Sequence, residues 1–446
     1  MGTFESLLFC KLFFCHRMFF MSFRNHLLKI IKNVFSFETF FVFFLFSYQF
    51  KNSYPFSLFP DITLFFTFIL LPWFIVLYRR MPTVCLFHSE TVSFLLFSFW
   101  VLLSSFWVTQ TSYSISKSLC FAVYTIPSFF MAYFIIAMND ERLKRFFSVV
   151  VFLSIWAHLE AYKEFILSHW VVVDVLGNNY LVTGSTLGSG FILLTVFSFS
   201  LLKDEQTNNT VFFWLLMTLC GTYAYIQLQL GGRGPVIGVI LTLCYFYING
   251  FRKNDSQFYI RHFLYFIIYC VFIYLFLYFF FRAGACNFLG RVYNIVGLDS
   301  LGVNNVVVDE SISFRLEYYR SAISVFLENP FLGLGFGGWA LFHDTLYHYT
   351  PLAHDLREVL WRHPHNIGLE ILSETGLIGA LLGIWFGILI FRKKLFLLSA
   401  CSFLDLASIL LFIFSLFNAL KSGDLNDNIL LFVTAAIIVS RAKVKP

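Results

Sequence analysis

Long apolar runs separated by short polar segments recur along the whole chain. A helix needs about 20 predominantly apolar residues to cross the hydrocarbon core of a bilayer. By this criterion the pattern predicts about twelve transmembrane helices, over residues 36–50, 60–78, 91–109, 118–138, 146–167, 185–202, 211–230, 235–250, 263–281, 366–391, 395–418 and 427–440. The predicted fold class is therefore an all-α polytopic membrane protein.

The composition agrees with this fold class and excludes a soluble globule. Hydrophobic residues make up 59% of the 446-residue chain, and charged residues only 13%. Such a balance is typical of a protein that is solvated by lipid. The net charge of +6 comes from basic residues scattered at predicted helix ends, so we expect no nucleic-acid partner.

Lysine and arginine are distributed unevenly between alternating connections. If the N-terminus is cytoplasmic, most of the 31 Lys and Arg residues fall in cytoplasmic segments, as the positive-inside rule requires. Both termini are therefore predicted to be cytoplasmic. The N-terminal region has no small-residue cleavage signal after its apolar run, so we expect an uncleaved anchor.

One external connection, residues 282–364, is far longer than the others. A long loop in a compact protein is usually functional or disordered, and helical periodicity here predicts an ordered amphipathic helix. Ser311 is its expected N-cap and Asn329-Pro330 its expected end, and the apolar positions are Ile312, Leu316, Tyr319, Ile323 and Phe326. We expect this helix to lie on the membrane surface or to cover a cavity. The predicted domains are a membrane bundle, the external loop and the C-terminal membrane helices, over 1–281, 282–364 and 365–446.

A titratable cluster precedes the tenth predicted span, in the stretch WRHPHNIGLEILSETGLIGALLG at 361–383. Pro364 fits the first turn of a helix, where its missing N–H is not needed. His365 would then lie at the positive end of the helix, where that end and Arg362 disfavour imidazolium. We expect a largely neutral His365 whose lone pair can accept a proton, at a helix end that attracts phosphate. The alternative is that these residues only mark where the helix leaves the bilayer.

Other polar and glycine-rich segments are open to two readings each. GGRGP, 231–235, presents Arg233 between glycines, which suits phosphate binding but also an ordinary interhelical turn. GNNYLVTGSTLGSG, 177–190, is predicted to be a polar turn that either contacts sugar hydroxyls or merely re-enters the membrane. GLGFGG, 333–338, permits a tight turn or close backbone approach, and it lacks the features of a nucleotide-binding loop.

The tenth predicted span carries two further features. Gly379, Gly383 and Gly387 recur at every fourth residue and predict a face for close helix packing. Glu370 and Glu374 share one side of the same helix. Carboxylates are costly in lipid, so they should face a cavity or a basic partner.

These motifs together resemble the O-antigen ligase and O-antigen polymerase family of bacterial membrane glycosyltransferases. The resemblance rests on four segments, PHNIGLEILSETGLIG at 364–379, NPFLGLGFGGW at 329–339, FRLEYYR at 314–320 and GRGP at 232–235. Family patterns often place Ser where Gly232 stands. The resemblance implies a GT-C-like architecture with one large periplasmic loop that contains an amphipathic helix.

The resemblance also implies chemistry and partners. Such proteins transfer glycan from an undecaprenyl diphosphate donor at the periplasmic face of the inner membrane, with inversion and without metal, cofactor or nucleotide sugar. The acceptor is a saccharide or the lipid A core, the lipid bilayer surrounds the protein, and a chain-length regulator is a further expected partner. By this resemblance His365 is the candidate catalytic base, and Arg233 and Arg315 bind the donor diphosphate. From their positions in the same motifs we add four candidate substrate-binding residues, Arg320, Arg362, Asn366 and Glu370.

Several functions remain open at this stage. The HPHNIGLEILSETGLIG form favours a repeat-unit polymerase, with an O-antigen ligase as the alternative and a flippase for lipid-linked glycans as an alternative of another class. Charged groups collect at the outer surface instead of at the midplane of paired halves, which favours an enzyme over a transporter. The loop histidines, His343, His348, His354, His363 and His365, raise a metal alternative, but their spacing fits no zinc pattern.

Overall fold

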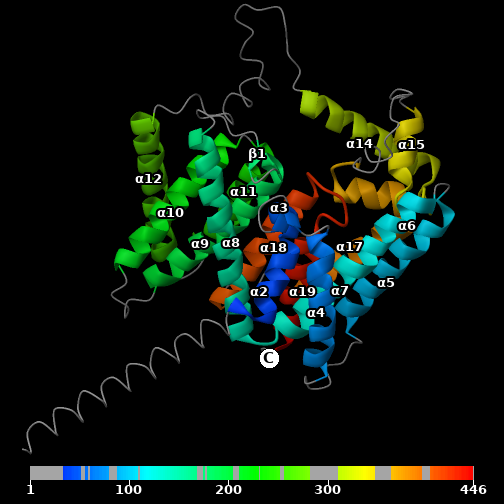
Figure 1. Ribbon diagram of the computed structural model, residues 1–446, viewed down its shortest axis with the longest axis horizontal. Helices are drawn as coiled ribbons and strands as arrows, with labels where there is room; N and C mark the ends of the chain where they lie inside the picture. Colours follow the sequence, from blue (N-terminus) through cyan, green and yellow to red (C-terminus); the bar gives the residue numbers. More distant parts are fainter. Residues whose placement is uncertain are drawn as a thin grey trace, which may run out of the picture.

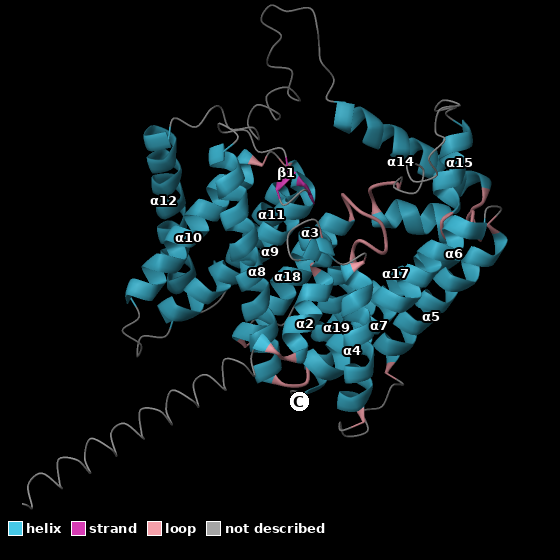
Figure 2. Ribbon diagram, viewed as in Figure 1, coloured by secondary structure: helices cyan, strands magenta, loops and turns pink. Residues whose placement is uncertain are grey.

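The computed structural model describes most of the chain, and Figure 1 shows its course. The described residues are 34–51, 56–58, 61–79, 88–108, 111–167, 174–175, 178–203, 210–230, 232–251, 256–281, 310–346, 363–393 and 402–444. These segments are helical apart from short turns and one pair of two-residue antiparallel strands, β1 (Asp174–Val175) and β2 (Asn178–Asn179) (Figure 2). The predicted all-α class is therefore confirmed for this part of the chain.

The helices follow the predicted apolar runs closely. They are α2 (Phe37–Leu45), α3 (Ser47–Phe50), α4 (Ile62–Tyr78), α5 (Ser89–Ser104), α6 (Thr111–Cys120), α7 (Ile126–Met131), α8 (Asp140–Leu167), α9 (Tyr180–Lys203), α10 (Thr210–Gln229), α11 (Arg233–Phe251), α12 (Ser256–Phe281), α14 (Glu310–Glu328), α15 (Gly338–Leu346), α17 (Ile367–Lys393), α18 (Phe403–Ala419) and α19 (Ile429–Val444). Short 3-10 helices are η1 (Phe56–Leu58) and η2 (Ser105–Trp107), and π-helical turns η3 (Phe121–Thr125) and η4 (Ala132–Ile136) flank α7.

Seven described segments are long and apolar enough to cross a membrane. They are Ser89–Trp107, Ser112–Ile136, Asp140–Leu167, Leu181–Leu202, Val211–Gln229, Ser256–Phe276 and Ile367–Arg392, and four shorter apolar helices accompany them at Ile62–Tyr78, Gly234–Gly250, Phe403–Ala419 and Ile429–Ala442. This supports a multi-pass membrane protein. The total of about twelve spans stays a prediction.

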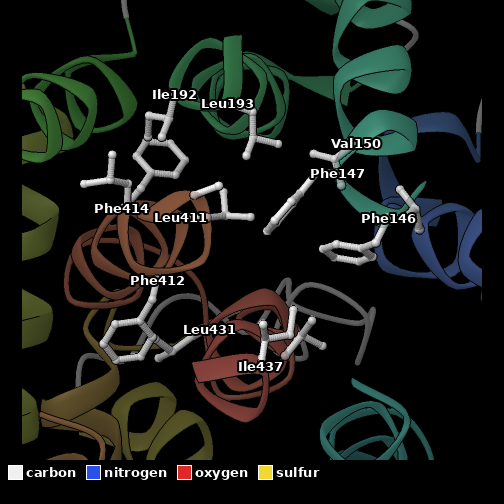
Figure 3. Close-up of a cluster of buried hydrophobic side chains, with 14 of the residues drawn as sticks. Phe146, Phe147, Val150, Ile192, Leu193, Leu411, Phe412, Phe414, Leu431 and Ile437 are labelled. Atoms are coloured by element: carbon white, nitrogen blue, oxygen red, sulfur yellow. The ribbon is translucent and has the colours of Figure 1, made fainter. Parts of the chain in front are cut away.

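The centre of the bundle is packed by aromatic and aliphatic side chains. Figure 3 shows side chains of α8, α9, α18 and α19 converging, and those labelled are Phe146, Phe147, Val150, Ile192, Leu193, Leu411, Phe412, Phe414, Leu431 and Ile437. Lipid tails are as apolar as these residues, so close packing holds such helices together more than the hydrophobic effect does. Gly188 on α9 contributes to this packing, since a Cβ there would lie 2.3 Å from the Phe414 ring.

The prediction of a polar turn over 177–190 is wrong for most of its length. From Tyr180 onward this stretch forms the first turns of α9. The hydroxyls of Ser185, Thr186 and Ser189 donate to backbone carbonyls four residues earlier. Hydroxyl groups satisfied in this way do not interrupt a helix, and the glycines between them allow close helix contact.

The described part of the segment 282–364 has the predicted helix, and a face other than the predicted apolar one packs against α15. α14 starts at Glu310, so the expected N-cap Ser311 lies inside the helix, and it ends before Asn329-Pro330 as predicted. Ala322 and Val325 pack against Trp339 and Ala340 of α15. The predicted apolar positions Leu316 and Ile323 are exposed instead, together with Leu327.

Candidate functional site

The site begins where α17 begins, around His365. Asn366 is the N-cap of α17, because its side-chain oxygen accepts the N–H of Leu369 (3.1 Å) and its carbonyl accepts that of Glu370 (2.9 Å). The helix thus starts after Pro364, and the expectation that Pro364 occupies its first turn is wrong. His365 immediately precedes the cap with φ of +53° and is the one non-glycine residue with positive φ in the described segments. Such a conformation costs about 1–3 kcal/mol and is concentrated at functional sites.

His365 lies between an aromatic ring and positive charges. Its imidazole stacks on Tyr318 of α14, with ring centroids 5.8 Å apart and planes 8° apart, and the His363 ring lies 4.2 Å away. Burial, aided by the charges of His363, Arg315 and Lys421, lowers the pKa of His365 from 6.5 to about 3. A neutral imidazole was expected, but burial is the main cause instead of the helix end, and Arg362 lies outside the described residues.

The Nδ1 atom of His365 is buried and has no hydrogen-bond partner among the described residues. A neutral imidazole has one nitrogen with a free lone pair. The lone pair can accept a proton from a bound substrate, and an anionic ligand beside the ring would raise the pKa of His365 from this low value towards neutral pH.

The glycine-rich loop after α14 enters a break in α17. Gly376 has φ of +66° and ψ of −166° inside the helix, a conformation that is essentially confined to glycine. The N–H groups of Leu334 and Gly335 donate to the carbonyls of Ser373 (2.9 Å) and Glu374 (2.7 Å). In return, the carbonyls of Pro330 and Phe331 accept the N–H groups of Leu377 (2.8 Å) and Ile378 (3.4 Å).

The loop therefore replaces the helical hydrogen bonds that the break removes. The indole N–H of Trp100 on α5 also donates to the Thr375 carbonyl (3.0 Å). Non-helical backbone is tolerated at membrane depth only where protein satisfies its polar groups. The prediction that GLGFGG permits close backbone approach is confirmed. The tenth predicted span, 366–391, is not one regular helix in the structure, because its backbone breaks at Gly376.

Two glutamates in the first two turns of α17 form a buried ion cluster with a lysine of α6. The Lys117 ammonium on α6 is 2.6 Å from Glu370 and 2.9 Å from Glu374, and all three side chains are at most 3% exposed. The predicted basic partner of the two carboxylates is thus Lys117. Glu370 also accepts the backbone N–H of Leu425 (2.9 Å). Its described contacts therefore stabilise the packing of α6, α17 and the α18–α19 turn, and none of them is to a surface where a substrate could bind.

Only part of the predicted glycine face of α17 packs against another helix. Added Cβ atoms at Gly379 and Gly383 would lie 3.1 Å from Trp100 and 3.4 Å from Phe97, both on α5. Gly387 has nothing within 4 Å of that position, so its predicted packing role is wrong.

The GRGP segment joins this region through Lys421. Arg233 is the first residue of α11. A Cβ on the next residue, Gly234, would lie 1.3 Å from the Lys421 ammonium nitrogen, so Lys421 rests on the start of α11. Because Lys421 also acts on His365, the structure brings the GRGP segment and the start of α17 to one region.

Arg315 and Arg320 occupy different sides of α14. Arg315 is half-buried and its charge acts on His365, whereas Arg320 is exposed. Five helical residues correspond to a rotation of about 140° relative to Arg315. Arg315 therefore belongs to the site around His365, and Arg320 points elsewhere.

Sequence reasoning missed Lys421, Tyr318 and the partnership of Lys117 with Glu370. A signal existed for Lys421, since a lysine in a short connection that is predicted to be external runs against the positive-inside rule. Tyr318 lies within the FRLEYYR motif, three residues after Arg315, on the same helix face.

Residues 216–384 match the family model described as O-antigen ligase. The resemblance to the O-antigen ligase and polymerase family is thereby confirmed. The matched segment includes Arg233, α14 with Arg315, the glycine-rich loop, His365 and the break in α17, but neither Lys117 nor Lys421.

No curated protein matches the chain. The family match supports activity of the O-antigen ligase or polymerase type.

Proposed function

We propose that this protein is an inverting glycosyltransferase that polymerises O-antigen or related repeat units at the periplasmic face of the inner membrane. The donor is a glycan on undecaprenyl diphosphate, the acceptor is a saccharide, and the reaction needs no metal. The observation that carries the proposal is the neutral, half-buried His365, whose Nδ1 is buried without a hydrogen-bond partner among the described residues, in a region that also holds Arg315 and Lys421. The family match supports the reaction class.

The proposed reaction forms one bond and breaks one. An acceptor hydroxyl oxygen attacks the anomeric carbon while the bond from that carbon to the diphosphate oxygen breaks. The hydroxyl proton passes to His365, and the electron pair of the broken bond leaves with undecaprenyl diphosphate. A positioned base contributes roughly 10²–10⁴-fold to such a step.

The leaving group gains negative charge as its bond breaks. Arg315 and Arg233 are the candidate cations that stabilise this charge, in a region where burial strengthens electrostatic interactions. Diphosphate is already a good leaving group, so the mechanism requires no general acid. The stacked Tyr318 ring limits the orientations that the His365 imidazole can adopt.

His365→Ala should abolish glycan transfer because it removes the base. The variant protein should remain in the membrane at the wild-type level, since its neighbours Tyr318 and Asn366 keep their own packing and capping roles. The measurement is surface-glycan analysis after complementation of a deletion strain, with immunoblotting of membranes. Retained transfer by the variant would remove His365 from the mechanism.

Arg233→Lys should impair transfer although it keeps the positive charge. Lysine lacks the planar fork that binds two phosphate oxygens at once. The same complementation assay measures the effect, and Arg320→Lys is the matched control because Arg320 lies on the exposed side of α14. Equal activity of the Arg233→Lys variant and wild type would argue against a bidentate contact there.

A second candidate function is ligation of finished glycan to the lipid A core, which the description of the matching family favours. Gel analysis of lipopolysaccharide and lipid-linked glycan after gene deletion distinguishes the two. Core bearing a single repeat unit identifies a polymerase. Bare core together with accumulated long lipid-linked glycan identifies a ligase. An unchanged pattern would argue against O-antigen as the product, and the next measurement would be the same analysis of other surface glycans.

A further inference from the structure

The turn between α18 and α19 carries a lysine into the candidate site. α18 ends at Ala419, and the backbone N–H groups of Lys421 and Ser422 both donate to the Asn418 carbonyl (3.1 and 2.7 Å). Gly423 follows with φ of +77°, which allows the chain to reverse. The backbone position of Lys421 is therefore set by the end of α18.

The same turn is fastened to the helix that carries His365. The N–H of Leu425 donates to Glu370, and the side-chain amide of Asn426 donates to the Lys117 carbonyl (3.0 Å). Glu370 is five residues after His365 and is fully buried. The ion cluster of Lys117 and the two glutamates thus holds the Lys421 turn and the start of α17 together.

The Lys421 ammonium group lies against the GRGP segment, 232–235. It rests on Gly234, so that even a methyl side chain at this position would displace it. This places a cation at the first turn of α11, next to Arg233. A helix start is itself positive, so an anion bound here would be stabilised by both the helix start and the Lys421 cation.

Two cationic side chains act on His365 from separate elements, Arg315 on α14 and Lys421 on the α18–α19 turn. The Tyr318 ring faces the imidazole. Cations that converge on one place from separate elements suit a ligand with more than one negative charge.

We propose that Lys421 is a third cation of the donor site and contacts the diphosphate of the lipid-linked glycan together with Arg233 and Arg315. This inference rests on the proposed function. The ammonium is a compact charge on a flexible stem, so it can stay with the leaving diphosphate as the bond to the sugar breaks. Lys421 lies outside the segment that matches the family model.

The test measures binding of undecaprenyl diphosphate and undecaprenyl phosphate to the purified full-length protein in phosphatidylcholine nanodiscs. Wild type should prefer the diphosphate. Lys421→Met should weaken diphosphate binding by about 10-fold or more and reduce this preference, because a hydrogen bond to a charged group is lost. Lys421→Arg should retain most of the preference. Lys163→Met is the matched control, since Lys163 is 60% exposed and paired with Glu160.

A second variant keeps the lysine but moves it. Gly234→Ala should displace only the flexible end of Lys421, so the protein should fold while diphosphate binding weakens as in Lys421→Met. Wild-type binding in both the Lys421→Met and Gly234→Ala variants would overturn the assignment. An effect that appears only when phosphatidylglycerol is added to the discs would also overturn it, in favour of a lipid headgroup site.

The outcomes separate this inference from the proposed function. If wild type fails to bind undecaprenyl diphosphate and fails to transfer glycan, the proposed function is wrong. If wild type does both, His365→Ala abolishes transfer and Lys421→Met binds the diphosphate normally, only the role of Lys421 is wrong.

Discussion

At the scale of single residues, the site depends on one histidine in an uncommon backbone conformation. His365 adopts positive φ directly before the Asn366 cap, and its ring is held against Tyr318. Burial keeps the imidazole neutral, and the surrounding cations reinforce this effect. A base and a group of cations can thus coexist without the base becoming protonated.

The pKa of His365 predicts how stability depends on pH. Because its pKa falls from 6.5 to about 3 on folding, the unfolded chain binds more protons in this interval. The contribution of His365 to stability is therefore fully present above about pH 6.5 and is lost as the pH falls towards 3, by at most about 1.4 kcal/mol per pH unit.

The measurement compares thermal unfolding of wild type and His365→Gln in detergent from pH 8 to pH 5. The difference between the two melting temperatures should be constant above about pH 7 and should move in favour of the variant below pH 6.5. Parallel curves over the whole range would show that His365 is not held neutral in the folded protein.

At the scale of elements, the α17 helix and the glycine-rich loop form one unit. The break at Gly376 exposes backbone groups that the loop residues 330–335 satisfy. Gly333 and Gly376 are needed here because the two backbones touch, and a Cβ on either would lie 2.5 Å or less from backbone atoms of the other segment. The loop thereby links α14, which carries Arg315, to the helix that follows His365.

Two glycines of α17 should respond oppositely to alanine. Gly376→Ala should destabilise the protein by about 3 kcal/mol or more, because it adds backbone strain and a clash with the Phe331 carbonyl,. Gly387→Ala should be neutral or stabilising by up to about 1 kcal/mol, since Gly387 is helical and faces open space,. Thermal unfolding of both variants in detergent measures this, and equal melting temperatures would contradict the role assigned to the break.

At the scale of the whole molecule, the site region and the C-terminus lie at opposite ends. Figure 1 shows α14 and α15 at one end and the C-terminus at the other. Asp140, at the start of α8, pairs with Arg441 near the C-terminus (2.6 Å), whereas the end of α8 lies beside β1. α8 therefore runs from the predicted cytoplasmic side to the predicted periplasmic side.

Two matched lysines on α8 test this orientation. Lys144 and Lys163 are 56% and 60% exposed, and each pairs with a glutamate three residues earlier. They are separated by about 28 Å along the helix, close to the thickness of the hydrocarbon core. In intact spheroplasts, a membrane-impermeant maleimide should label Lys163→Cys, but should label Lys144→Cys only after the membrane is permeabilised. The reverse pattern would invert the topology.

The sequence alone was sufficient for features that depend on local pattern. Apolar runs located the membrane helices, because crossing lipid requires a long apolar segment whatever its neighbours are. Asn329-Pro330 located the end of α14, and His365 stood out because a titratable cluster preceded a membrane span. Gly333 and its neighbours indicated close backbone approach, since glycine permits the required φ.

Tertiary structure decided everything that depends on which segments meet. Lys117 and Glu370 are 253 positions apart, and no local pattern indicates their pairing. Ala322 and Val325 form the face of α14 that packs on α15, and this face lies outside the apolar positions from which the helix was predicted. The break at Gly376 exists because a distant loop supplies hydrogen bonds that a helix would otherwise provide for itself. Lys421 lies against Gly234 and acts on His365 for the same reason, since helix packing, and not spacing along the chain, brings these three residues into one region.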